Sequence, residues 1–188
     1  MYDAFRIVLS IVISPIILPH ILCVLIQSRS RRRLIISDIE RWSFLKKSPF
    51  NNRWLNFLLL LVWLPEYRSL LRAHLGYIGH ILYFPRPKTN LYIWCHSIGE
   101  GLFIEHGFST VIAAKSIGRN CWINQQVTIG DSGKGIPIIG NNVHICAGAI
   151  VVGPIHIGDN ATIGAGAIVV EDVPSDSLVI SEKAHQYR

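Results

Sequence analysis

Two hydrophobic patterns divide the chain. Up to about residue 83 the apolar residues come in long runs, and from Ile98 onward single aliphatic residues recur every six residues. Long apolar runs are typical of helices that are buried or lie against lipid, whereas a six-residue period is typical of a parallel β-helix. We therefore expect a helical, membrane-associated region over residues 1–83, a linker over 84–97, a β-helix over 98–174 and a tail over 175–188.

The six-residue period continues through twelve units, with one residue inserted after Ile104 and four after Ile129. Each unit would form a short strand and a turn, with its aliphatic side chain inside a narrow prism. Three units make one coil, so the predicted fold is mainly β: a parallel β-helix of about four coils. Helices of hexapeptide units coil left-handed, an exception to the right-handed crossover rule. The aliphatic positions are Ile98, Ile104, Val111, Ile117, Ile123, Ile129, Ile139, Ile145, Val151, Ile157, Ile163 and Val169.

The first apolar run, residues 7–26, contains 20 uncharged residues. At about 1.5 Å per residue a helix of this length could cross a hydrocarbon core of about 30 Å. Pro15 and Pro19 interrupt the helical hydrogen bonds, so a bent hairpin within one leaflet is an alternative, and a helix buried against the rest of the region is another. Arginines 29, 31, 32 and 33 follow the run and would lie on the inner side of a membrane. We expect attachment to the cytoplasmic face of a bacterial inner membrane.

Two shorter apolar segments follow. Residues 55–64 are too few to span a bilayer and end at Pro65, which indicates a core or in-plane helix. Residues 66–82 have the spacing of one amphipathic helix, with Arg68 and Arg72 on a basic side that could rest on lipid headgroups or on a partner subunit.

The charge is distributed unevenly between the two halves. Residues 1–97 hold 13 Lys and Arg and 4 Asp and Glu, a net charge of +9, and residues 98–188 hold 5 and 8, a net charge of −3. Four of the five tryptophans also precede residue 98. This combination favours an anionic membrane surface over nucleic acid, for which no binding motif is visible. The four cysteines have no CxxC spacing and are expected to be reduced thiols.

Segments 98–112, 117–130, 139–153 and 157–174 resemble the serine acetyltransferase branch of the hexapeptide acyltransferases, and more closely the acetyltransferases of capsule, O-antigen and colanic-acid clusters. The resemblance implies acetyl-CoA as donor, His106 as general base and an active site between subunits of a homotrimer. The acid before the histidine is retained as Glu105. The family's carboxylate fifteen residues earlier is Leu91 here, and its histidine before the loop proline is Ile136. Both differences weigh against serine as acceptor.

The residues themselves also single out His106. It is the third residue of its unit, an outward position, and the same position in later coils is held by Gln125, Ala147 and Ala165. This leaves a track of about 10 to 15 Å along which a pantetheine arm could lie, with a backbone N–H near it for the developing oxyanion. Small residues along the track, Ala147, Gly148, Gly164 and Ala165, would allow close approach. The alternative is an ordinary surface histidine.

The loop of residues 131–137 leaves the repeat after Ile129 and Gly130. We expect a flap over the acyl site with Lys134 near a CoA phosphate, or else a solvated insertion. Lys183 in the tail is a second phosphate candidate. His144 and His156 fall on different prism faces, so no metal site is expected.

Three functions remain open on these grounds. The first is an O-acetyltransferase that acetylates a hydroxyl of a sugar or of a lipid-linked polysaccharide precursor. The second is a serine O-acetyltransferase of cysteine biosynthesis, and the third is a non-enzymatic β-helix scaffold.

Overall fold

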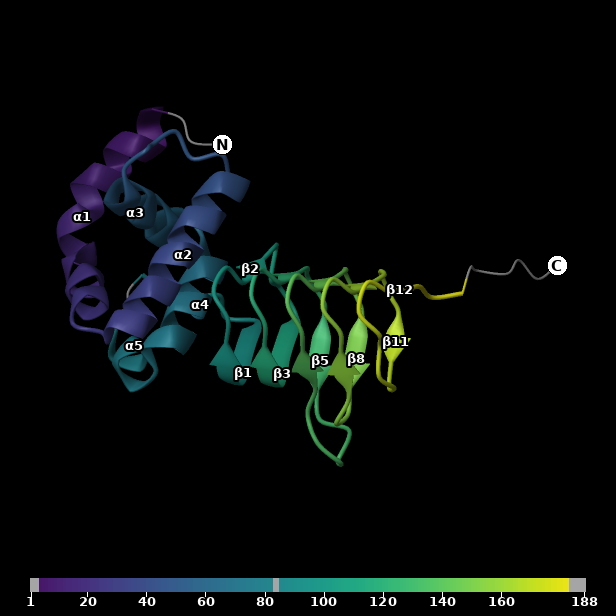
Figure 1. Cartoon of the computed structure of the whole chain (residues 1–188). Helices are drawn as coiled ribbons and strands as arrows, with labels where there is room; N and C mark the ends of the chain where they lie inside the picture. The colour runs from purple at the N-terminus through teal and green to yellow at the C-terminus, as the bar shows by residue number, and fades with distance from the viewer. Residues whose placement is uncertain (1–3, 83–84, 183–188) are drawn as a thin grey trace.

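The computed structural model describes residues 4–82 and 85–182, and it joins a helical region to a long β-helix (Figure 1). Side-chain caps define two of the helix starts: Ser28 accepts from the amide of Arg31, and Asn52 accepts from the amides of Trp54 and Leu55. The helices are α1 (Ala4–Leu25), α2 (Arg29–Leu45), α3 (Arg53–Trp63), α4 (Pro65–Leu75) and α5 (Tyr77–Ile81).

The first apolar run forms one helix, so the bent hairpin predicted as an alternative is wrong. Pro15 and Pro19 both lie inside α1. Each proline removes one backbone donor, but α1 packs against α2 and α3, and this packing holds the helix together across the two interruptions. The side that faces α2 and α3 buries Ser10, Ile17, His20 and Val24.

The single amphipathic helix predicted over residues 66–82 is interrupted. Gly76 has a φ of +56°, a left-handed conformation that ends α4 and lets α5 start in a new direction. The basic side predicted for this helix also differs from the structure, because Arg68 binds backbone carbonyls of α3. Arg68 donates from Nη1 to the carbonyls of Leu61 and Val62, at 2.5 and 3.0 Å, so its guanidinium caps the end of α3.

The β-helix is a left-handed parallel solenoid with three faces. The first face contains β5, β8, β11 and the first half of β3, and the second contains β6, β9 and the second half of β3. The third face contains β2, β4, β7, β10 and β12. The strands are β1 (Leu91–Ile98), β2 (Phe103–Ile104), β3 (Thr110–Ile117), β4 (Trp122–Ile123), β5 (Thr128–Gly130), β6 (Ile138–Ile139), β7 (His144–Ile145), β8 (Ile150–Val152), β9 (His156–Ile157), β10 (Thr162–Ile163), β11 (Ile168–Val169) and β12 (Leu178–Val179).

The predicted register is wrong at one of the twelve aliphatic positions. Ile112, not Val111, points into the prism: Ile112 is fully buried and pairs with Ile129, whereas Val111 is half-buried and pairs with Thr128. The unit that begins at Ile104 therefore has two extra residues instead of one, and the unit from Ile112 to Ile117 is one residue short. The turn that holds them has positive φ at His106 (59°) and Ser109 (50°), which the aliphatic spacing alone does not reveal.

The solenoid is longer at both ends than predicted. Strand β1 pairs with β3 in parallel from Leu91 to Ile98, so the second half of the expected linker over 84–97 belongs to the first coil. At the other end β12 pairs with β10, which extends the β-helix beyond residue 174. The ends were missed because the pairing depends on backbone hydrogen bonds that continue where the aliphatic repeat weakens.

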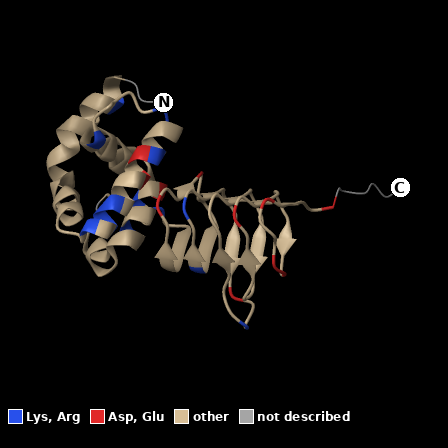
Figure 2. Cartoon of the chain, in the orientation of Figure 1, with Lys and Arg blue, Asp and Glu red and all other residues tan. Residues whose placement is uncertain are grey.

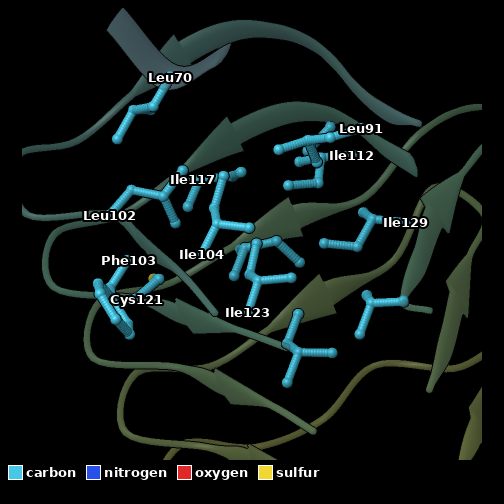
Figure 3. Close-up of a cluster of buried hydrophobic side chains, with 14 of the residues drawn as sticks. Leu70, Leu91, Leu102, Phe103, Ile104, Ile112, Ile117, Cys121, Ile123 and Ile129 are labelled. Carbon is cyan, nitrogen blue, oxygen red and sulfur yellow. The ribbon is translucent and has the colours of Figure 1, made fainter. Parts of the chain in front are cut away.

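The helical region and the solenoid share one hydrophobic core. Leu70 of α4 packs above Leu91 and Leu102, and Ile104, Ile112, Ile123 and Ile129 continue the core down the prism (Figure 3). Trp42 of α2 lies at the junction, with its ring 4.7 Å from that of Phe103 and 5.4 Å from that of Tyr67. Its Nε1 donates to the carbonyl of Leu102 at 2.7 Å. The helices therefore cover the apolar end of the first coil.

Candidate active site

His106 lies at an exposed corner of the first coil, directly after β2. Its carbonyl accepts a hydrogen bond from the amide of Phe108, which closes a tight turn. Gly107 in this turn is buried, and a Cβ at that position would lie 3.1 Å from both Leu91 and Glu66. The close packing at Gly107 therefore fixes the backbone beside His106 against α4 and β1.

The column predicted above His106 is present. The third face pairs Ile104 with Ile123, Ile123 with Ile145, and Ile145 with Ile163. The residues two places later, which are His106, Gln125, Ala147 and Ala165, consequently stack at one corner of the prism. At about 4.8 Å per coil the column is about 14 Å long. It is polar at His106 and Gln125 and is lined by methyl groups beyond them.

The backbone amides along this column divide into two groups. Those of Gly148 and Gly164 donate to the carbonyls of Gln125 and Val179, at 3.1 and 2.7 Å, so these glycines contribute space and not free donors. The amides of Ala147 and Ala165 donate to no hydrogen bond within residues 4–82 and 85–182. The amides of His106 and Gln125 donate to none either, so all four residues of the column have backbone donors without a partner among the described residues.

Glu105 belongs to a polar chain on the third face. Its Oε2 accepts from Nδ2 of Asn124 at 3.4 Å, and Oδ1 of Asn124 accepts from Nε2 of His144 at 2.9 Å. Lys46, at the end of α2, reaches the other side of the carboxylate, with Nζ 3.8 Å from Oε1. Burial lowers the pKa of His144, and the negative charge of Glu105 opposes this shift. At neutral pH His144 is therefore a neutral donor to Asn124.

This polar chain was not part of the sequence prediction. Asn124 and His144 occupy outward positions next to the aliphatic repeat. Stacking of the coils therefore places them beside Glu105. No sequence pattern places Lys46 near Glu105, because the position of Lys46 depends on how α2 packs on the first coil. Its ammonium also lies 5.1 Å from the centre of the Phe103 ring, over the same junction.

The loop of residues 131–137 does not cover the His106 corner of its own chain. It follows β5 and projects from the far edge of the first face, whereas His106 and Gln125 precede that face (Figure 1). Oδ1 of Asp131 accepts from the amides of Gly133 and Gly135 at 2.7 and 2.9 Å, which gives the loop a defined shape. Gly130 and Lys134 are therefore at a different corner from the column of the same chain, and the predicted flap over the acyl site stays a prediction.

Leu91 is buried and packs against Gly107, so the position of the family's carboxylate is apolar in this chain. Lys183 lies outside the described residues. Among the residues that are described, no group of three or more His, Cys, Asp or Glu side chains could hold a metal ion.

A cavity of about 370 Å³ opens between α4, α5 and β1, with Leu91 in its wall. Tyr92 and Trp94 line it with half or more of their surface exposed, at 50% and 68%, and their ring centres are 5.9 Å apart. Arg72 gives the wall positive charge, whereas Lys88 pairs with Glu66, with Nζ 3.1 Å from Oε1. Leu91 also packs against Gly107, so one residue of the cavity wall adjoins the turn that carries His106.

Known proteins similar to this chain are serine acetyltransferases. The chain is 49% identical to that of Synechococcus elongatus over 88 residues, which cover 44% of this chain and 36% of the relative. It is 41% identical to that of Synechocystis sp. over 151 residues, which cover 72% of this chain and 59% of the relative. The chain thus spans between about a third and three fifths of these relatives' length. No family model matches the chain.

Solved structures agree with the sequence comparison. Serine acetyltransferase isoform 3 of Entamoeba histolytica, in complex with cysteine, has a TM-score of 0.65 at 26% identity and covers 85% of this chain and 61% of its own. Soybean serine acetyltransferase complexed with serine has a TM-score of 0.58 at 24% identity, covers 84% and 70%, and supports the fold alone. The expected closer likeness to capsule, O-antigen and colanic-acid enzymes is not supported by these relatives.

Proposed function

We propose that this protein transfers an acetyl group from acetyl-CoA to a hydroxyl group, with His106 as the general base. The observation that carries the proposal is the corner column, in which an exposed histidine in the first coil is continued by Ala147 and Ala165 with unused backbone amides. The sequence similarity to serine acetyltransferases supports the same reaction.

A hydroxyl group is a weak nucleophile at neutral pH, so its proton must be removed as the new bond forms. The imidazole of His106 accepts this proton while the hydroxyl oxygen attacks the acetyl carbonyl. Hydrogen bonds from the amides of Ala147 and Ala165 would hold the acyl and pantetheine oxygens along the column. The tetrahedral intermediate then collapses, the carbon–sulfur bond breaks, and His106 returns the proton to the thiolate. No acyl-enzyme is required.

The acceptor favoured by the comparisons is L-serine, because the similar proteins carry that name. A sugar hydroxyl is the second candidate, and the cavity beside Leu91 supports it. Exposed aromatic rings such as Tyr92 and Trp94 stack on the apolar faces of sugar rings, and the guanidinium of Arg72 suits an attached phosphate. Leu91 and Ile136 are also apolar where the resemblance implies a carboxylate and a histidine.

The site is proposed to be completed by a neighbouring subunit of a homotrimer. One chain carries its His106 column and its 131–137 loop at opposite edges of the first face. In a ring of three copies the loop of one subunit can reach the column of the next, and Lys134 would then lie near a CoA phosphate. This supplies the flap that a single chain lacks.

The proposal is tested by thiol release from acetyl-CoA, with L-serine, nucleotide sugars and lipid-linked saccharides offered in turn as acceptors. His106→Ala should lower kcat by about 10²- to 10⁴-fold, the usual contribution of a general base, with little effect on acetyl-CoA affinity. His156→Ala is the matched control, because His156 is exposed on the second face. Wild-type turnover by His106→Ala would refute the mechanism, and an absence of turnover with every acceptor would favour a scaffold.

A further inference from the structure

Helix α1 presents a wide apolar surface that no part of the described chain covers. Eight large apolar side chains on its outer side, and Ile26 directly after its end, are between 42% and 71% exposed. Over residues 7–26 this side carries no charged group. A soluble protein rarely leaves a continuous apolar surface of this extent in water, so such a surface indicates an interaction site. The nine residues are Phe5, Val8, Ile11, Val12, Ile16, Leu18, Leu22, Leu25 and Ile26.

The opposite side of α1 is attached to the protein. Nε1 of Trp63 in α3 donates to Oγ of the buried Ser10 at 2.9 Å, and the guanidinium of Arg6 lies 5.0 Å from the centre of the Trp63 ring. Helix α2, which carries many charged residues, packs on the same side. A helix that crossed a bilayer would have to draw these polar elements into the hydrocarbon core, where unsatisfied groups are strongly disfavoured. Only the outer half of α1 is therefore available to lipid.

Positive charge borders the apolar surface where α1 ends. Arg29, Arg31 and Arg33 are exposed in the first turns of α2, and the guanidinium of Arg32 donates to the carbonyl of Leu25 at 2.9 Å. Figure 2 shows the basic residues gathered on the helices, while the β-helix carries mostly acidic ones. An apolar face bordered by arginines complements a bilayer with anionic headgroups, whereas a protein partner would require a matching acidic rim.

We propose that α1 docks the protein on an anionic lipid bilayer, lying in the plane of the membrane with its outer face in the acyl boundary and the arginines on the headgroups. Figure 1 shows α1 at the end of the molecule opposite to β12, so the β-helix extends away from the lipid. His106 is in the coil next to the helical region and is held close to the membrane surface. The docking itself does not depend on the proposed acetyl transfer.

Sedimentation of the full-length protein with vesicles tests this. One set contains phosphatidylcholine alone, and the other contains 30% phosphatidylglycerol as well. We expect wild-type protein to bind the anionic vesicles at least tenfold more strongly, and added salt to weaken the binding. Val8→Glu combined with Val12→Glu should abolish it. Ile168→Glu on β11 is the matched control, because Ile168 is as exposed as Val12, at 68% each, but far from α1. Circular dichroism checks that both variants are folded.

Three results would overturn the proposal. The first is binding by the double glutamate variant that equals wild type. The second is protein that resists extraction by alkaline carbonate, which would indicate a span in place of in-plane docking. The third combines two observations: wild-type protein binds neither kind of vesicle, and light scattering shows an oligomer that dissociates in the double variant. In that case a second copy of the chain covers α1.

Discussion

Nε2 of His74 lies 2.8 Å from Oδ2 of Asp38, and both side chains are almost completely buried. The other oxygen of Asp38 accepts from the amide of Gly101 at 2.5 Å, in the first turn of the β-helix. Burial raises the pKa of Asp38, and the contacts with His74 and Gly101 oppose the shift. One carboxyl group therefore connects α2, α4 and the solenoid at the point where the helices cover the first coil.

Replacement of Asp38 should destabilise this junction. Removing one member of a buried pair leaves the other polar groups without a partner, which typically lowers the free energy of unfolding by about 3–5 kcal/mol. We expect Asp38→Ala to show a loss of this order in urea denaturation. Glu40→Ala is the control: Glu40 pairs with Arg53 at 2.8 Å on the surface, where such a pair contributes about 0–1 kcal/mol. Equal midpoints for the two variants would contradict the assigned role of Asp38.

The thiol of Cys121 should be unreactive in the folded protein. Burial raises its pKa to about 11, and Sγ donates to the carbonyl of Gly140 at 3.1 Å. The unfolded thiol ionises near its ordinary value of 9.0, so the stability that this group contributes is complete below pH 9 and is lost as the pH rises toward 11. At pH 8 iodoacetamide should label Cys121 only after unfolding. Rapid labelling of native protein, located by mass spectrometry, would argue against this environment.

Glu105 should affect the reaction less than His106 does. Its carboxylate accepts from Asn124 and lies near Lys46, so Glu105→Gln keeps the size of the side chain but removes its charge. A hydrogen bond to a charged group is worth about 1 kcal/mol more than a neutral one, which corresponds to a several-fold change in kcat. Steady-state kinetics should show this decrease for Glu105→Gln and a smaller one for Lys46→Met. A loss as large as that of His106→Ala would make Glu105 the principal acid or base.

A large side chain in the alanine column should block the donor. Ala147→Phe would fill the space beside the unused amides of Ala147 and Ala165, and we expect the KM for acetyl-CoA to rise at least tenfold, equivalent to about 1.4 kcal/mol. His156→Phe adds a ring of the same kind on another face and should leave KM unchanged. If both variants behave like wild type, the pantetheine arm does not follow this corner.

Local sequence signals determine some parts of this molecule, and the packing of distant segments determines others. The aliphatic period predicted the prism because each inward residue of the repeat is aliphatic and can be recognised in the sequence by its spacing. At Val111 and Ile112 two aliphatic neighbours compete for one inward position, and only the turn at His106 decides between them. Lys46 and the cavity beside Trp94 arise from helix packing, for which the sequence contains no periodic signal. The His106 column was predictable because stacking of identical units brings residues 18 to 22 positions apart into register.

The loop between β5 and β6 has a consequence for how the substrate range of such proteins could change during evolution. Gly130 and Ile138 on either side of it are held by pairing with Val152 and His156 in the next coil, so the prism closes in the same register whatever the loop's length. Insertions and deletions at this site change what projects from the corner without disturbing the core. Descendants of one stable scaffold could thus acquire new binding surfaces by exchanging a segment of seven residues, 131–137, while the His106 column is inherited intact.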